Sequence, residues 1–354
     1  MQWNLTDEQE TYQESLRGWL AQNLTSETLR EYLKSGDSAP FDAQMLKDGW
    51  LGVGIDESVG GQGGNLVELA MAAEEFGRSG APSSPWLASV LATVALAGRT
   101  GLAETMFGTG ESIALAIPAD RIPGDGPNLS SDAEGVITGD VPSVLGADRA
   151  VRFIVPVTTS SGRELHLVDA TDVEVTRRRL LDGSRSVADL EFRGVVGERL
   201  DVDADEVLER VARIAAVLTA ADSLGASQRM LDMAVSYSLQ RKQFGVAIGS
   251  FQAVKHAAAM MLVATEAARS IVYFAAASVA QEHPEASLHA SAVKAQVTAE
   301  GAHTADSALT LHGAIGYTEE HDLQIFYKRA KLNEYLFGQP HSWNERIARG
   351  LTLV

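Results

Sequence analysis

The sequence predicts an α+β protein with a helical N-terminal domain, a middle antiparallel β domain and a C-terminal bundle of long helices. Apolar residues recur at helical spacing near the N-terminus, short β-rich runs fill the middle, and long Ala-rich helical stretches follow. From these changes of pattern we expect domains at residues 1–110, 111–202 and 203–354.

The N-terminal zone begins with a helix start signal. Thr6 is a predicted N-cap because acidic residues follow it directly. The glycine-rich stretch 60–64 predicts a loop, and residues 66–78 predict another helix that ends before Gly80 and Pro82. The first helix carries apolar residues at helical spacing at Leu16, Trp19, Leu20 and Leu24.

The middle zone contains β-rich runs that Gly, Pro, Asp and Ser separate, which is typical of a small antiparallel sheet. The predicted strands are Ser112–Ile117, Val136–Thr138, Val151–Val157, Glu164–Val168, Val173–Thr176 and Asp189–Phe192.

The C-terminal zone predicts long helices over 207–240, 252–281 and 285–312, joined by short turns. Helices of this length with short connections favour an antiparallel bundle, here of four or five long helices.

Composition restricts the function. The chain has 354 residues, a net charge of −18 and no cysteine, which excludes disulfides, thiolate catalysis and Cys-type zinc sites. The negative charge disfavours nucleic-acid partners. The polar, acidic start lacks the pattern of a signal peptide, and no apolar run reaches the roughly 20 residues of a membrane span. We therefore expect a cytoplasmic protein that does not enter a membrane.

The ordered motifs resemble the acyl-CoA dehydrogenase family over essentially the whole chain. The family's flavin-contacting turn matches Arg241–Gly245 with Gln252, and its glycine loop matches Leu311–Tyr317 followed by Glu320. Its N-terminal domain matches Trp50–Gly54, Gly60–Gly63 and Glu74–Arg78. A single such motif is weak, whereas the set in register is specific.

The resemblance implies an FAD site. Arg241 is a permanent cation suited to the FAD pyrophosphate, Gln243 and Gln252 offer neutral hydrogen bonds, and Phe244 offers an apolar face. In the family the turn and the glycine loop reach the FAD of a neighbouring subunit, which implies an oligomer. The purely structural alternatives are that Arg241 and Lys242 cap the C-terminus of a helix and that the glycines only form a turn between two helices. The remaining residues assigned to the cofactor are Gly313, Ala314, Gly316 and Gln339.

Two departures from the family are informative. Ile117–Asp120 and Pro142–Leu145 stand where the family has the segments that wall the flavin, so this wall is expected to be degraded. A gap-free alignment places Phe337-Gly338-Gln339 where the family has Glu-Gly-Thr, and Phe337 cannot take a proton from a substrate. The family's alternative place for the base falls on Ala215 and Ala216.

Other acid–base candidates are less favoured. Glu334 and Glu345 flank the missing base, but glutamates near helix ends are usually solvated. His312 falls in the glycine loop, where the resemblance implies no catalytic role, and His341 follows Pro340 at a place where the resemblance implies a cofactor contact. The histidines His283, His289 and His303 have no EXXH context, so no metal site is expected.

These observations support one main hypothesis and two alternatives. The chain resembles the base-lacking subunit of heteromeric (α2β2) bacterial dehydrogenases of steroid or lipid acyl-CoA thioesters. The resemblance implies a partner subunit that carries the catalytic Glu, an acyl-CoA substrate and an acceptor such as an electron-transfer flavoprotein. The alternatives are a self-sufficient flavoenzyme with Glu334 as a displaced base, and a non-catalytic binding or scaffold protein.

Overall fold

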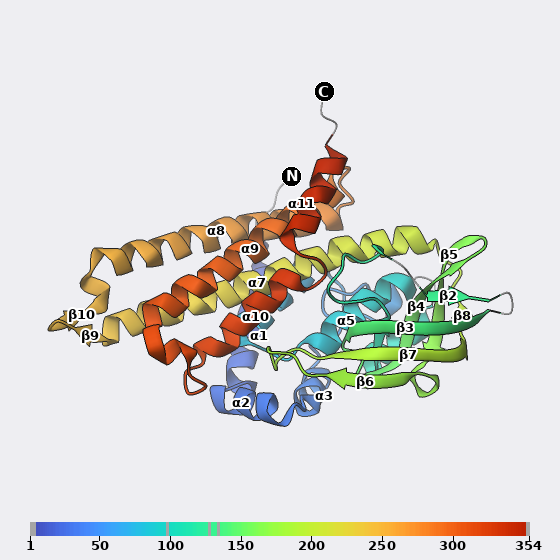
Figure 1. Cartoon of the computed structure of the whole chain (residues 1–354), viewed down its shortest axis with the longest axis horizontal. Coiled ribbons are helices and arrows are strands. Elements are labelled where there is room, and N and C mark those ends of the chain that lie inside the picture. The colour runs from blue at the N-terminus through green and yellow to red at the C-terminus, as the bar shows by residue number, and fades with distance from the viewer. Residues whose placement is uncertain (1–4, 97–98, 127–128, 133–134, 352–354) are drawn as a thin grey trace. The chain divides into compact units, whose positions relative to one another are not determined.

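The computed structural model describes residues 5–96, 99–126, 129–132 and 135–351 (Figure 1). It divides into two compact units, which we treat separately. Unit 1 comprises residues up to Glu31, then Ala70–Ala81, and the chain from Ala216 onward, whereas unit 2 comprises Tyr32–Leu69 and Pro82–Ala215. Helices α4 (Leu66–Ser79) and α7 (Ala204–Gln240) contribute residues to both units.

The predicted helix–strand–helix order is confirmed. The first helices are α1 (Asp7–Asn23), α2 (Ser26–Ser35), α3 (Ala39–Lys47), α4, α5 (Ser84–Thr93) and α6 (Thr100–Thr109). All strands of the main sheet follow between Ser112 and Arg199, and the long helices begin at Ala204.

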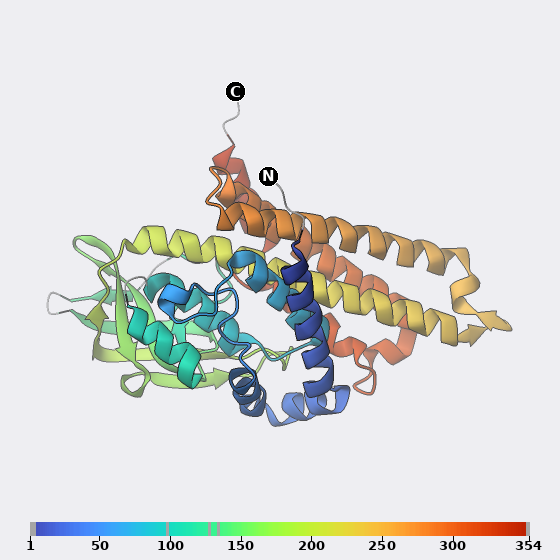
Figure 2. The same cartoon turned by 180° about the vertical axis from the view of Figure 1, so that it is seen from behind.

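Helix α1 begins where the sequence predicts. The Thr6 hydroxyl accepts a hydrogen bond from the Gln9 amide (3.2 Å), and the Gln9 side chain accepts one from the Thr6 amide (3.0 Å), which forms a capping box. Leu16 and Leu20 are buried as their spacing predicts. In the reverse view α1 crosses the long helices of unit 1, where Gln13 donates to Glu74 of α4 (Figure 2).

Unit 2 contains the sheet. Its order is β6-β7-β3-β2-β4-β5-β8, with β1 paired to β4. The ladders β3–β7, β4–β5 and β6–β7 are antiparallel as predicted, but β4 runs parallel to β1 and β2. The core includes Phe153, Val155, Leu190 and Phe192. The strands are β1 (Ser112–Leu115), β2 (Leu129–Ser131), β3 (Val136–Leu145), β4 (Ala150–Thr159), β5 (Gly162–Asp169), β6 (Glu174–Arg178), β7 (Val187–Val196) and β8 (Glu198–Arg199).

Unit 1 contains the helix bundle. It combines the later part of α7 with α8 (Gln252–Ala280), α9 (Ala286–His312), α10 (Leu323–Tyr335) and α11 (Pro340–Gly350). Helix α9 packs against α8, α10 and α11. Small residues allow close approach: a Cβ on Gly301 of α9 would lie 2.2 Å from the Ser223 hydroxyl of α7. The Ala-rich pattern therefore serves close helix packing.

A buried ion pair ties α10 to α7 within unit 1. The Arg329 guanidinium donates to both oxygens of Asp222 (2.8 and 2.5 Å), and the Asn333 amide donates to the same carboxylate (2.7 Å). Arg329 is fully buried and also donates to the Ala81 carbonyl (2.7 Å). Arg329 and Asp222 each neutralise the other's buried charge. Removing one partner of such a pair typically lowers the free energy of unfolding by about 3–5 kcal/mol.

Helix α8 has one packed face and one exposed apolar face. Its length and mean hydropathy of 1.3 would suit a membrane span, which is weak evidence for a single helix. Arg269 on this helix pairs instead with Glu74 inside unit 1, as expected of a helix in a packed bundle. Met260, Leu262 and Val263 are exposed elsewhere on the same helix.

Candidate functional site

The turn after α7 is a tight hairpin. Strand β9 (Lys242–Gln243) pairs with β10 (Val246–Ala247), and Phe244 and Gly245 form the two-residue connection. Both have positive φ, 53° and 82°, as a type I′ turn requires. Glycine adopts this conformation freely, whereas a bulky phenylalanine rarely does. The turn therefore holds Phe244 in a conformation that its own backbone disfavours.

The side chains of this turn face solvent. Phe244 is 92% exposed, and its ring meets the ring of Phe251 edge to face, with centroids 6.2 Å apart. Arg241, Gln243 and Gln252 are exposed as well. Among the described residues, no carboxylate lies within ion-pair distance of the Arg241 guanidinium. A free cation beside an uncovered aromatic ring suits an anionic, partly apolar ligand.

The glycine loop follows α9 as a 3₁₀ turn over Gly313–Tyr317. Gly313 has φ 64° and ψ −144°, which favours glycine, and a Cβ there would meet no atom within 4 Å. Gly313 and Ala314 are exposed. Gly316 is buried, where a Cβ would approach the Leu309 side chain to 2.9 Å. Gly316 thus allows close packing against Leu309, whereas Gly313 leaves its backbone accessible to a ligand.

The hairpin and the glycine loop lie at the same end of unit 1 (Figure 1). The Tyr237 ring, one helical turn before Arg241, stacks on His312, which directly precedes Gly313 (centroids 4.8 Å apart). The His312 Nδ1–H donates to the Ala308 carbonyl (2.7 Å), and burial lowers the pKa of His312. His312 is therefore a packing residue. We call residues 241–252 and 313–317 the exposed end.

The position where the resemblance implies the catalytic base lies in a buried loop, Leu336–Gln339, which we call the closed loop. Phe337 is only 2% exposed and has φ 56°, followed by Gly338 with φ 98°. Trp343 Nε1 donates to the Phe337 carbonyl (3.0 Å), and Lys294 Nζ donates to the Gly338 carbonyl (2.8 Å). These bonds fix an apolar side chain where the resemblance implies a carboxylate.

Lys294 is a residue that the sequence analysis missed. It is fully buried on α9 and also donates to the carbonyls of Asn333 (3.1 Å) and Glu334 (3.4 Å). Burial lowers the pKa of Lys294 to about 7, and the nearby charge of Glu334 acts in the opposite direction. Nothing in a single Ala-rich helix indicates this role, since its acceptors are some forty residues away in the sequence.

The other acid–base candidates lie in ordinary surroundings. Glu334 is half-buried in the last turn of α10, beside Lys294. Glu345 is exposed and pairs with Arg349 (3.3 Å), and His341 is exposed. Ala215 and Ala216 are fully buried.

The two segments of the expected flavin wall meet within unit 2. Pro118 and Val144 form an isolated antiparallel bridge, and the Ala119 amide donates to the Ser143 carbonyl (3.1 Å). Ser143 has φ 52°, and its amide donates to Asp189 (2.9 Å). Pro118 and Ala119 bring no hydrogen-bonding side chain to this place.

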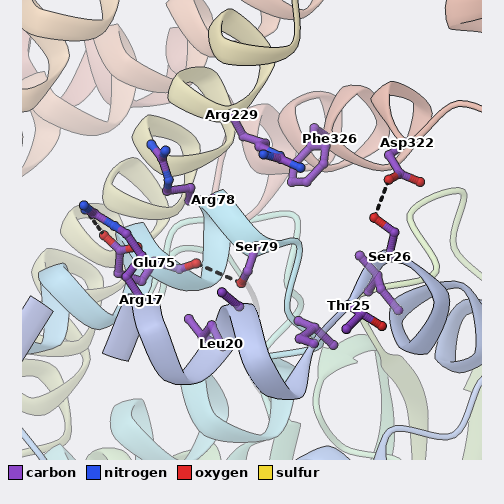
Figure 3. Close-up of a pocket in the computed structure, with 13 residues that line it drawn as sticks. Arg17, Leu20, Thr25, Ser26, Glu75, Arg78, Ser79, Arg229, Asp322 and Phe326 are labelled. Atoms are coloured by element: carbon purple, nitrogen blue, oxygen red, sulfur yellow. Dashed lines mark hydrogen bonds and ion pairs between the residues drawn. The ribbon is translucent and has the colours of Figure 1, made fainter. Parts of the chain in front are cut away.

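Unit 1 also contains a polar cavity of about 280 Å³ (Figure 3). Its charges are largely paired: Arg17 binds Glu75 (2.7 Å), Arg78 binds Asp232 (2.9 Å), and Arg30 binds the lining residue Asp322 (2.7 Å). Arg229 lies over the Phe326 ring, 5.8 Å from its centroid. None of the predicted cofactor residues lines this cavity.

Comparison with known proteins identifies the family. The chain matches the family model of the acyl-CoA dehydrogenase C-terminal domain over residues 207–352 and that of the N-terminal domain over residues 6–104. It is 32% identical over 297 residues to acyl-CoA dehydrogenase IpdE2 of Mycobacterium tuberculosis, covering 83% of this chain and 80% of that one. The chain belongs to the acyl-CoA dehydrogenase family.

Two further similarities extend over the full length. IpdE2 of Mycolicibacterium smegmatis is 29% identical over 351 residues, which cover 97% of this chain and 98% of the relative. The crystal structure of the ChsE4–ChsE5 complex from M. tuberculosis contains a chain with a TM-score of 0.89 and 26% identity, and all of both chains is covered.

Acyl-CoA dehydrogenases use FAD, and the exposed end fits such a group. The unpaired Arg241 suits a pyrophosphate, Gly313 leaves its backbone accessible, and Phe244 offers an apolar face. Seven of the eight predicted cofactor residues lie at this end. Gln339 does not: it is the N-cap of α11 in the closed loop, separated by the 13 residues of α10, roughly 20 Å of helix.

Proposed function

We propose that this chain is a subunit of an FAD-dependent acyl-CoA dehydrogenase that desaturates the Cα–Cβ bond of an acyl-CoA thioester. Its exposed end contacts FAD across a subunit interface, and a second, similar chain carries the catalytic Glu. The observation that carries the proposal is the contrast between Phe337, buried at the base position, and Arg241 with Phe244, exposed and unpaired.

The chemistry requires two groups. FAD held at the exposed end would supply the acceptor for a hydride from Cβ of the substrate. A carboxylate must take the proton from Cα, and Phe337 has no atom that can do so. Lys294 is the nearest titratable group that holds the closed loop, but its Nζ is occupied by backbone carbonyls. In this proposal the proton is taken by a residue of another chain.

In this proposal Arg241 pairs with the FAD pyrophosphate, and Gln243 and Gln252 donate to neighbouring polar groups of the cofactor. Phe244 packs against an aromatic ring of the cofactor or the partner. The hairpin fixes the backbone that carries Gln243 and Phe244, which reduces the backbone entropy lost on binding. The open backbone at Gly313 and Ala314 gives a phosphate close access.

A second chain also accounts for the apolar surface of α8. Met260 is 67% exposed, Val263 62% and Leu262 48%, on a helix whose other face is packed. Exposed apolar side chains of this kind are unfavourable in water and are typical of a subunit interface. The similarity to a chain of the ChsE4–ChsE5 complex supports a partner of the same family, and we propose an α2β2 heterotetramer.

We further propose the substrate, the cellular compartment and the electron acceptor. The substrate is an acyl-CoA, with a steroid side-chain thioester as the expected class, and the complex acts in the cytoplasm. The reduced cofactor must pass its electrons on, for which an electron-transfer flavoprotein is the expected acceptor. The domain division at residues 110 and 202 remains part of this proposal.

The decisive experiment is to express the chain alone and together with any similar chain that an adjacent gene encodes. We expect little flavin in the isolated chain, a co-purifying complex with a visible flavin spectrum, and bleaching of that spectrum by acyl-CoA only in the complex. A stoichiometric flavin band in the isolated chain that substrate bleaches would contradict the proposal.

Glu334 as a displaced base is the second candidate. Its half-buried carboxylate lies near Lys294, whose charge it balances in part. Replacing Glu334 with Gln removes the base but keeps the shape of the side chain. Unchanged bleaching by substrate in Glu334→Gln excludes the candidate, and lost bleaching with intact flavin supports it. A complex that binds FAD but no acyl-CoA would favour a scaffold role.

A further inference from the structure

A cluster of metal-binding residue types lies where α8 ends and α9 begins. His283, Glu285 and His289 each offer one donor atom, and these atoms lie within 4.8 Å of one another. All three belong to unit 1, and none is at the exposed end or in the closed loop. The sequence does not predict this cluster, because the spacing His-x-Glu-x₃-His follows no helical zinc motif.

The turn geometry brings the first two residues next to α9. Glu282 adopts a left-handed conformation (φ 50°), and the His283 amide donates to the Ser278 carbonyl (3.0 Å), which closes the C-terminus of α8. Glu285 directly precedes the first residue of α9, and His289 lies one helical turn further on. His283 and His289 then face each other with ring centroids 5.3 Å apart.

Two contacts orient the His289 imidazole as a metal ligand would need to be oriented. Its Nδ1 bonds the hydroxyl of the buried Ser278 (2.7 Å), and the Phe274 ring packs against its imidazole with centroids 4.7 Å apart. With Nδ1–H donating to Ser278, the Nε2 lone pair is free, and Nε2 lies 4.0 Å from a Glu285 oxygen. Such an outer hydrogen bond orients most metal-bound histidines.

The other two ligands are adaptable. Donors bound to zinc at about 2.0–2.1 Å lie roughly 3.3 Å apart, so the cluster must contract slightly. The Glu285 side chain is 63% exposed and free to move, and among the described residues no Lys or Arg pairs with it. The His283 Nδ1 accepts a hydrogen bond from the Glu285 amide (3.1 Å), and this bond must be released if that nitrogen binds the metal.

We propose that His283, Glu285 and His289 bind a divalent cation, with Zn²⁺ as the best fit, and thereby fasten α8 to α9. Two imidazoles and one carboxylate form a nitrogen–oxygen donor set that zinc accepts with water in the fourth position. The net charge of −18 also favours cation binding. This proposal does not depend on the proposed flavin chemistry.

The test is calorimetric titration of ZnSO₄ into the tag-free full-length chain after removal of metals with EDTA. We expect one site with a dissociation constant in the micromolar range and a zinc-dependent rise in melting temperature. His289→Ala should weaken binding at least 30-fold. Glu285→Gln, which changes an exposed side chain and leaves the fold intact, should weaken it about 10-fold.

His303→Ala is the matched control. His303 is 73% exposed and lies 3.9 Å from Glu300, so it is a surface His–Glu pair without a third ligand. Its replacement should change zinc affinity less than twofold. Equal losses in His303→Ala and His289→Ala, or wild-type affinity in Glu285→Gln, would overturn the proposal, as would the absence of a stoichiometric site in the wild-type chain.

Discussion

Two phenylalanines in the same backbone conformation show how differently the two regions of unit 1 are built. Phe244 at the exposed end and Phe337 in the closed loop both have positive φ (53° and 56°), and a glycine with positive φ follows each. Phe244 is 92% exposed, whereas Phe337 is 2% exposed. A conformation that costs roughly 1–3 kcal/mol is thus compensated by packing at Phe337 and uncompensated at Phe244. The exposed end is therefore the part of unit 1 best explained by a contact outside the chain.

The largest expected effect compares these two residues directly. Phe337→Ala should lower the free energy of unfolding by about 3–5 kcal/mol, because it leaves a cavity in a packed site. Phe244→Ala removes a side chain that touches little, so the change should stay within about 0.5 kcal/mol. Urea unfolding of the isolated chain measures both. Similar losses in the two variants would mean that Phe244 is packed in solution.

The closed loop should depend strongly on Lys294. In Lys294→Met the carbonyls of Asn333 and Gly338 lose their buried donor, and the free energy of unfolding should fall by about 3 kcal/mol. Lys331→Met on α10 is the control, since Lys331 pairs with the exposed Asp306 (2.9 Å) and should contribute less than about 1 kcal/mol. An equal effect of the two changes would refute a special role for Lys294.

The exposed end should matter for the cofactor and not for folding. Arg241→Ala should weaken FAD retention by the complex by about 1.5–3 kcal/mol, roughly 10- to 100-fold, because it removes a charged hydrogen bond. Flavin fluorescence released on dilution measures the loss. Lys242→Ala, the neighbouring cation, should have a smaller effect. Unchanged flavin occupancy in Arg241→Ala would contradict the proposal that Arg241 binds the FAD pyrophosphate.

The smallest expected effect is a pH dependence. Lys294 titrates near pH 7 when folded and near 10.5 when unfolded, so between these values the unfolded chain binds the extra proton. The stability of the wild type should therefore rise with pH across this window relative to Lys294→Met, by at most about 1.4 kcal/mol per unit. Urea unfolding of both proteins at pH 7, 8 and 9 measures the difference. A constant difference would show that Lys294 stays charged inside the fold.

The sequence predicts regular elements well and isolated short ones poorly. The capping box at Thr6 and the ends of the long helices follow from local signals. The strands β2 and β8 were missed because two or three residues carry too little periodicity. The parallel pairing of β4 with β1 and β2 was missed because strand direction depends on distant partners.

For the candidate site, the sequence by itself determined the residue types: the turn motif, the glycine loop and Phe337 in place of Glu. These are local patterns, and the alignment that puts Phe337 where the family has Glu needs no coordinates. Only the tertiary structure decided which of these residues lie together, which are exposed and which distant groups hold them. Gln339 lies apart from the other predicted cofactor residues, Lys294 holds the closed loop, and His283 lies next to His289. These arrangements depend on how distant segments pack, which no local pattern in the sequence indicates.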